Sequence, residues 1–79
     1  MNELIEKLIS LRTERKLTVK EVCRQAGIPQ SRLVEIERGV RIPTAGQIER
    51  LENFYETKSG ALAVLAKLSE KDFRVGSNN

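Results

Sequence analysis

Side chains that can hydrogen-bond to the edges of bases recur at helical spacing near the middle of this chain. If the segment is a helix, one face carries two adjoining rows of residues four apart: Gln30, Val34 and Arg38 in one row, and Ser31 and Glu35 in the other. Glutamine can contact adenine through two hydrogen bonds, serine can donate or accept, glutamate can accept from a base amino group, and valine can cover a thymine methyl group. We therefore expect Gln30, Ser31, Val34 and Glu35 to read bases in the major groove of double-stranded DNA.

The opposite side of the same segment is apolar. Leu33 and Ile36 are three residues apart and should anchor the helix in a core. Pro29 suits a first helical turn because it has no N–H group to leave unpaired, and Gly39 is a residue type at which helices end. These signals predict a recognition helix over about residues 29–38.

A second, shorter helix should come directly before the recognition helix. Thr18 and Glu21 have the spacing of a capping box, in which the two residues satisfy each other's backbone N–H groups. Gly27 can end this helix in a left-handed conformation, and Ile28 can fill the turn with an apolar side chain. Cys23 is expected to be a small core residue rather than a redox switch. The pattern is typical of a helix-turn-helix.

Cations and helix-capping hydroxyls surround this unit. The net charge of +3 is only mildly basic, so the distribution of charge is more informative than its total. Basic residues gather in the helix-turn-helix, whereas acidic residues dominate from Glu49 to Glu56. Seven residues are candidates for contacts to the phosphate backbone: Thr18, Lys20, Arg24, Arg32, Arg38, Arg41 and Thr44.

Three further helices should complete the fold. The first begins after Asn2, ends near Lys16 and places Arg12 at the edge of its leucine stripe, where a half-buried guanidinium needs a carboxylate. After Ile42, an expected core residue, Thr44 and Gln47 form a second capping box. The helix that they open should direct four side chains inward: Ile48, Leu51, Phe54 and Tyr55.

The last predicted helix, over residues 61–68, is apolar around most of its circumference. Such a surface favours a two-fold dimer made partly by Leu62, Leu65 and Leu68, although a simple closing helix stays an alternative. The domain is expected to span residues 1–75, with a further turn at 69–72, Phe73 packing back, and a disordered tail over 76–79.

Composition argues against several classes of function. The chain has no histidine and a single cysteine, which excludes a disulfide framework within the chain and argues against a zinc site. It also has no glycine-rich phosphate loop, and we expect no metal, no cofactor and no catalysis. Without an apolar run that could cross a membrane or a signal-peptide pattern, the expected location is the cytoplasm.

Several of these segments resemble the XRE family of helix-turn-helix domains, the lambda-repressor-like and Cro-like transcriptional regulators. The resemblance covers roughly residues 4–56 and rests on Leu17-Thr18, Glu21, Ala26-Gly27-Ile28, Gln30-Ser31, Ile36-Glu37-Arg38-Gly39 and Pro43. It implies a compact all-α fold of about five helices, the third of which lies in the major groove. Members of the family usually bind a palindromic operator as a homodimer. The resemblance also implies that Glu37 pairs with Arg12 as a structural ion pair, and that Gln30 and Ser31 read bases.

The leading hypothesis is therefore a sequence-specific, homodimeric transcriptional regulator that acts as a repressor by occupying its operator. The alternative is an antitoxin or adaptor module whose apolar C-terminal helix binds a partner protein, with DNA binding secondary.

Overall fold

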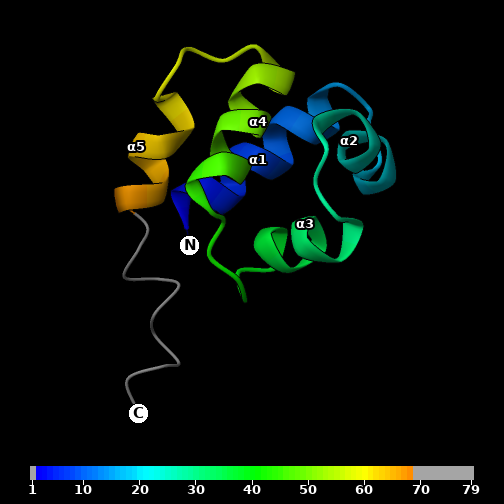
Figure 1. The fold of residues 1–79 in the computed structure, drawn as a ribbon, viewed down its shortest axis with the longest axis horizontal. Coiled ribbons are helices and arrows are strands. Elements are labelled where there is room, and N and C mark those ends of the chain that lie inside the picture. The colour runs from blue at the N-terminus through cyan, green and yellow to red at the C-terminus, as the bar shows by residue number, and fades with distance from the viewer. Residues whose placement is uncertain (1, 69–79) are drawn as a thin grey trace.

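The computed structural model describes residues 2–68, and this part of the chain consists of five α-helices joined by short loops (Figure 1). They are α1 (Glu3–Glu14), α2 (Val19–Ala26), α3 (Gln30–Glu37), α4 (Ala45–Tyr55) and α5 (Ala61–Leu68). The all-α, five-helix fold expected from the sequence is thereby confirmed. The expected turn at 69–72, Phe73, the domain boundary at 75 and the tail over 76–79 lie outside the described residues.

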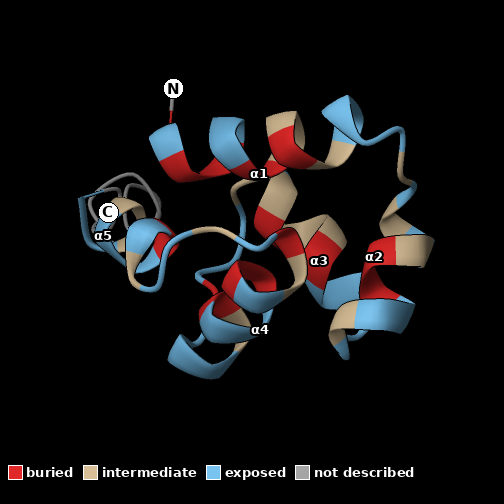
Figure 2. Cartoon of the chain, turned by 90° about the horizontal axis from the view of Figure 1, so that it is seen from above, coloured by how far each residue is buried: buried red, intermediate tan, exposed pale blue. Residues whose placement is uncertain are grey.

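The helices enclose one core. α2 packs on α3 and α4, α1 packs on α3 and α5, and α4 packs on α5. In Figure 2 the buried stretches of the helices turn toward the middle of the molecule and the exposed stretches toward solvent. Every helix contributes a fully buried side chain, and the set comprises Leu4, Leu8, Val22, Leu33, Ile36, Leu51 and Leu62. Aliphatic side chains therefore supply most of this core.

Side-chain caps set where three of the helices begin. Asn2 Oδ1 accepts the N–H of Ile5 at 3.1 Å at the start of α1. Both expected capping boxes form: Thr18 with Glu21 before α2, and Thr44 with Gln47 before α4. Each box satisfies two backbone donors that the first helical turn would otherwise leave free.

The expectation that Ile42 fills the core is wrong. Ile42 is 47% exposed, whereas its neighbour Pro43 is buried. A residue before proline is held in an extended conformation, and successive side chains of an extended segment point to opposite sides. Since Pro43 packs inward, Ile42 is directed toward solvent.

A buried carboxylate, Glu52, fixes the start of α5. Glu52 is 6% exposed, and its Oε2 accepts the N–H of Leu62 at 2.9 Å and the N–H of Ala63 at 3.0 Å. N–H groups in the first turn of a helix have no backbone partner within that helix. Glu52, a residue of α4, therefore caps α5. Burial raises the pKa of Glu52, but the hydrogen bonds from backbone N–H groups outweigh it and lower the pKa from its ordinary value of 4.5.

Replacing Glu52 with glutamine should cost roughly 1.5–3 kcal/mol of stability at neutral pH, because two N–H groups lose a charged acceptor. A carboxylate with a lowered folded-state pKa stabilises the fold above its unfolded pKa, and this contribution disappears as the pH falls through the folded value. The difference in denaturant unfolding between wild type and Glu52→Gln should therefore be full at pH 7 and vanish in strong acid. The exposed neighbour Glu49 provides the control Glu49→Gln, and a pH-independent difference would contradict the cap.

Candidate nucleic-acid interface

The turn between α2 and α3 is held by a left-handed glycine and by an arginine from α4. Gly27 has φ +77°, and its N–H donates to the carbonyl oxygen of Cys23 at 2.9 Å. Arg50 Nη1 donates to the carbonyl oxygen of Gly27 at 2.6 Å. Ile28, 3% exposed, follows the glycine and fills the space beneath the turn. The turn is thus fixed by its own backbone, by an apolar anchor and by a neighbouring helix.

The two faces of α3 differ as the residue spacing predicts. Leu33 and Ile36 are 1% and 0% exposed and bind the helix to the core. On the other side, Gln30 and Ser31 are exposed, while Val34 and Glu35 are half-buried. A helix of this kind, anchored on one side and polar on the other, has the dimensions to enter a major groove about 12 Å wide.

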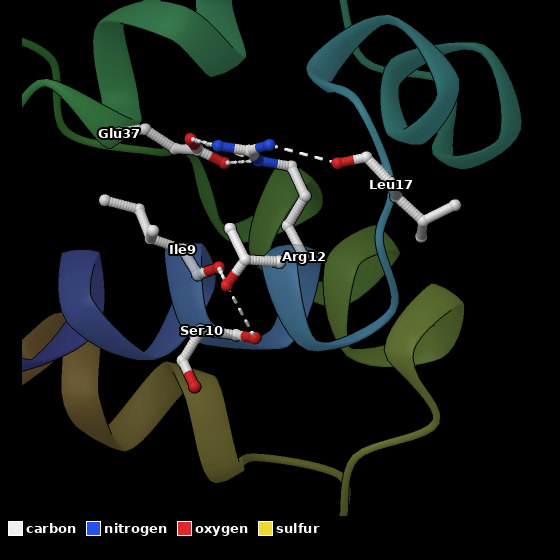
Figure 3. Close-up of polar contacts among 6 residues, drawn as sticks. Ile9, Ser10, Arg12, Leu17 and Glu37 are labelled. Atoms are coloured by element: carbon white, nitrogen blue, oxygen red, sulfur yellow. Dashed lines mark hydrogen bonds and ion pairs between the residues drawn. The ribbon is translucent and has the colours of Figure 1, made fainter.

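The end of α3 is joined to α1 by an ion pair between Arg12 and Glu37 (Figure 3). Arg12 Nε donates to Glu37 Oε2 and Arg12 Nη2 donates to Glu37 Oε1, each at 2.9 Å. The third nitrogen, Arg12 Nη1, donates to the carbonyl oxygen of Leu17 at 3.0 Å. The two charged side chains are only 19% and 8% exposed. The pair thereby fixes α3 to α1 and to the segment before α2.

A second group of charges lies on the exposed side of α3. Arg32 Nη1 donates to Glu35 Oε1 at 3.2 Å, and Arg41 Nε donates to the same oxygen. The hydrogen bond from Arg41 is the main cause that lowers the pKa of Glu35, with a further contribution from Arg32. Of the residues expected to contact DNA, the structure brings these three together.

The other expected phosphate contacts are also on the surface. Lys20, Arg24 and Arg38 are exposed. Thr18 and Thr44 are exposed as well, but their hydroxyl oxygens already accept the N–H groups of Glu21 and Gln47. These threonines therefore hold the starts of α2 and α4.

Cys23 belongs to the core rather than to a reactive site. The side chain is 7% exposed, and burial, with a smaller effect of the negative charge of Glu37, raises the pKa of its thiol. A raised pKa disfavours the thiolate, which is the nucleophilic form of cysteine. Among residues 2–68 no cluster of histidine, cysteine, aspartate or glutamate is suited to a metal ion.

Two residues with long-range structural roles, Arg50 and Glu52, were not identified from the sequence. Arg50 reaches the turn across 23 residues of sequence, and no local pattern indicates such a contact. The burial of Glu52 could have been predicted from helical spacing, since Glu52 lies on the inward stripe of α4 with Ile48 and Tyr55. A carboxylate on an apolar stripe indicates a buried acceptor for a neighbouring helix.

α5 presents a different type of surface. Leu62 is 0% exposed, so the expectation that it lies in a dimer surface is wrong: its side chain fills the protomer's own core. Leu65 is half-buried, whereas Val64 and Leu68 are 59% and 68% exposed. On another side of α5, lined by Ala63 and Ala66, an open groove of about 490 Å³ lies between this helix and the start of α4. Ile42, Pro43, Ile48 and Ala63 are among its apolar lining residues.

The exposed polar helix α3 follows α2 after a tight turn, and Arg50 of α4 holds that turn. This geometry defines a helix-turn-helix domain. A comparison with protein families matches residues 8–62 to the family described as Helix-turn-helix. The chain therefore belongs to the XRE, or lambda-repressor-like, helix-turn-helix family, whose members are DNA-binding transcription regulators and generally not enzymes. Comparisons with curated proteins and with solved structures gave no match. None of the helices within residues 2–68 has the length and apolar character needed to cross a membrane.

Proposed function

We propose that this protein is a repressor that binds a palindromic operator as a homodimer, with α3 in the major groove. The observation that carries the proposal is the exposure of Gln30 and Ser31 at the start of a helix whose other face is anchored by Leu33 and Ile36. In helix-turn-helix proteins the first residues of the recognition helix contact base edges. Gln30, Ser31, Val34 and Glu35 read the sequence, and the exposed cations hold the phosphates.

The homodimer uses the outer face of α5. Val64 and Leu68 are exposed and Leu65 is half-buried, which leaves an apolar surface for a second copy. A two-fold dimer places its recognition helices about 34 Å apart, one turn of DNA, and so requires a palindromic operator. Repression follows from occupancy of that operator. Sedimentation that showed only monomer at high micromolar concentration would exclude this dimer.

Selection of bound duplexes from a random pool tests the whole proposal. The expected result is one enriched sequence, composed of two inverted half-sites whose centres are about one helical turn apart. Enrichment of a single, non-repeated site would exclude the symmetric dimer but retain DNA reading. No enrichment over the starting pool would exclude sequence-specific binding.

Gln30→Ala should cost about 1–3 kcal/mol of discrimination at one base position of the selected duplex, because the bidentate contact is lost. Affinities for the selected duplex and for its single-base variants measure this loss. Arg38→Ala provides the contrasting variant: binding to all sequences should weaken alike, and the slope of log affinity against log salt should flatten by about one. A uniform loss for Gln30→Ala would remove this residue from base reading.

The second candidate is a protein-interaction module, such as an antitoxin or adaptor. The exposed Val64 and Leu68 of α5, and the apolar groove on another side of the same helix, favour it, because a partner protein could cover either surface. Co-purification with a partner in a fixed ratio would support this function. Duplex binding with a steep salt dependence would support the first.

A further inference from the structure

We propose that Glu35 sets the specificity of the DNA-binding face electrostatically, by holding Arg32 and Arg41 and limiting how tightly they bind phosphates of unrelated sequence. The inference rests on the proposed DNA-binding function. It assigns Glu35 a role as a positioning residue for two arginines in the free protein, in addition to the base contact expected from its place on α3.

The contacts around Glu35 join the recognition helix to the loop that follows it. One carboxylate oxygen accepts from both Arg32 Nη1 and Arg41 Nε. The backbone carbonyl of Glu35 also accepts the N–H of Val40 at 3.0 Å. The loop that carries Arg41 is therefore bound to α3 through the main chain and the side chain of one residue.

The three charged side chains lie at the surface, where DNA can reach them. Arg32 and Arg41 are each 44% exposed and Glu35 is 38% exposed. Two cations and one anion give this cluster a single net positive charge. Because the carboxylate repels phosphates, the cluster attracts the DNA backbone less than two free arginines would.

Sequence discrimination follows from what happens to Glu35 when DNA binds. When a DNA phosphate binds Arg32 or Arg41, the Glu35 carboxylate loses a hydrogen-bond donor while it faces the negatively charged DNA. Adenine and cytosine present amino groups in the major groove that can donate to Glu35, whereas guanine and thymine present acceptors there. Sequences that place an amino group at this position replace the lost hydrogen bond. Other sequences leave the carboxylate facing DNA without one.

The test compares wild type with Glu35→Gln on two duplexes, the one selected from the random pool and one of unrelated sequence, over a range of salt concentrations. Glu35→Gln should bind the unrelated duplex about three- to tenfold more tightly at 0.1 M salt, and the salt slope should steepen by about one. The ratio of the two affinities should fall. Glu56→Gln is the matched control, because Glu56 is exposed and follows α4 at its end away from the α3–α4 loop (Figure 1).

Unchanged or weaker binding of Glu35→Gln to the unrelated duplex would overturn the inference while leaving the DNA-binding function intact. An equal gain in Glu56→Gln would also overturn it, since the effect would then come from net charge alone. If wild type bound neither duplex, the proposed function would fail and the inference with it.

A double-mutant cycle tests whether the Glu35 carboxylate holds Arg41. Arg41→Gln should reduce affinity for the unrelated duplex more in the Glu35→Gln background than in wild type, because Arg41 is free to bind phosphate only in the former. Equal losses in both backgrounds would show that Glu35 does not restrain Arg41, and would overturn the proposal.

Discussion

Replacing Arg12 with alanine should lower the free energy of unfolding by about 3–5 kcal/mol, because the carboxylate of Glu37 then stays buried without a counter-charge. Glu37 is 8% exposed, and three hydrogen bonds from the Arg12 guanidinium surround its two oxygens. The carbonyl oxygen of Leu17 loses its arginine donor in the same variant. For a protein of this size, such a loss is a large part of the total stability.

Denaturant unfolding followed by circular dichroism measures this effect. A joint replacement, Arg12→Met with Glu37→Met, should recover most of the loss, because it removes both buried charges and leaves apolar side chains in their place. Arg32→Ala is the matched control. It breaks an exposed arginine–glutamate pair on the surface of α3 and should leave the unfolding midpoint nearly unchanged. If Arg12→Ala were as mild as this control, the ion pair would not stabilise the fold.

Leu62→Ala should cost about 3–5 kcal/mol, since it removes a fully buried side chain and leaves a cavity where α5 meets the core. Leu62 is the buried residue of α5, so the helix depends on it more than on any other of its side chains. The loss should appear in denaturant unfolding. Native-state hydrogen exchange should also show the amides of α5 losing protection before those of α3.

Leu68→Ala is the control on the same helix. Leu68 is 68% exposed, so its truncation should change the stability of the monomer little, whereas it should weaken the proposed dimer. Unfolding should therefore respond to Leu62→Ala, which acts on the protomer. Sedimentation should respond to Leu68→Ala, which acts on the dimer. A Leu62→Ala variant as stable as Leu68→Ala would contradict the assignment of Leu62 to the core.

Much of this fold could be predicted from the sequence, because its signals act over three or four residues. The capping boxes at Thr18 and Thr44 depend on a threonine and an acceptor side chain three residues later, and both form as the spacing indicates. Gly27 ends α2 with a positive φ, a conformation that other residues adopt at a cost. The apolar and polar sides of α3 likewise follow from helical periodicity alone.

The partners of charged residues could be predicted less completely. The position of Arg12 on the edge of an apolar stripe indicated that it needs a carboxylate, but only the family resemblance suggested Glu37, 25 residues away. Glu35 could be assigned to the exposed face of α3 from its spacing. Its capture by Arg41 could not, because that contact depends on the path of the loop after Gly39.

The sequence by itself determined the helices, the caps at the starts of α1, α2 and α4, and the polar face of α3, since each arises from neighbours along the chain that interact within one or two turns. Only the tertiary structure decided that Arg50 closes the turn at Gly27, that Glu52 caps α5, and that Leu62 points inward while Ile42 points outward. These outcomes depend on how helices distant in sequence pack together. A helical pattern defines which side chains share a face, but the packing of the other helices defines which part of that face is covered.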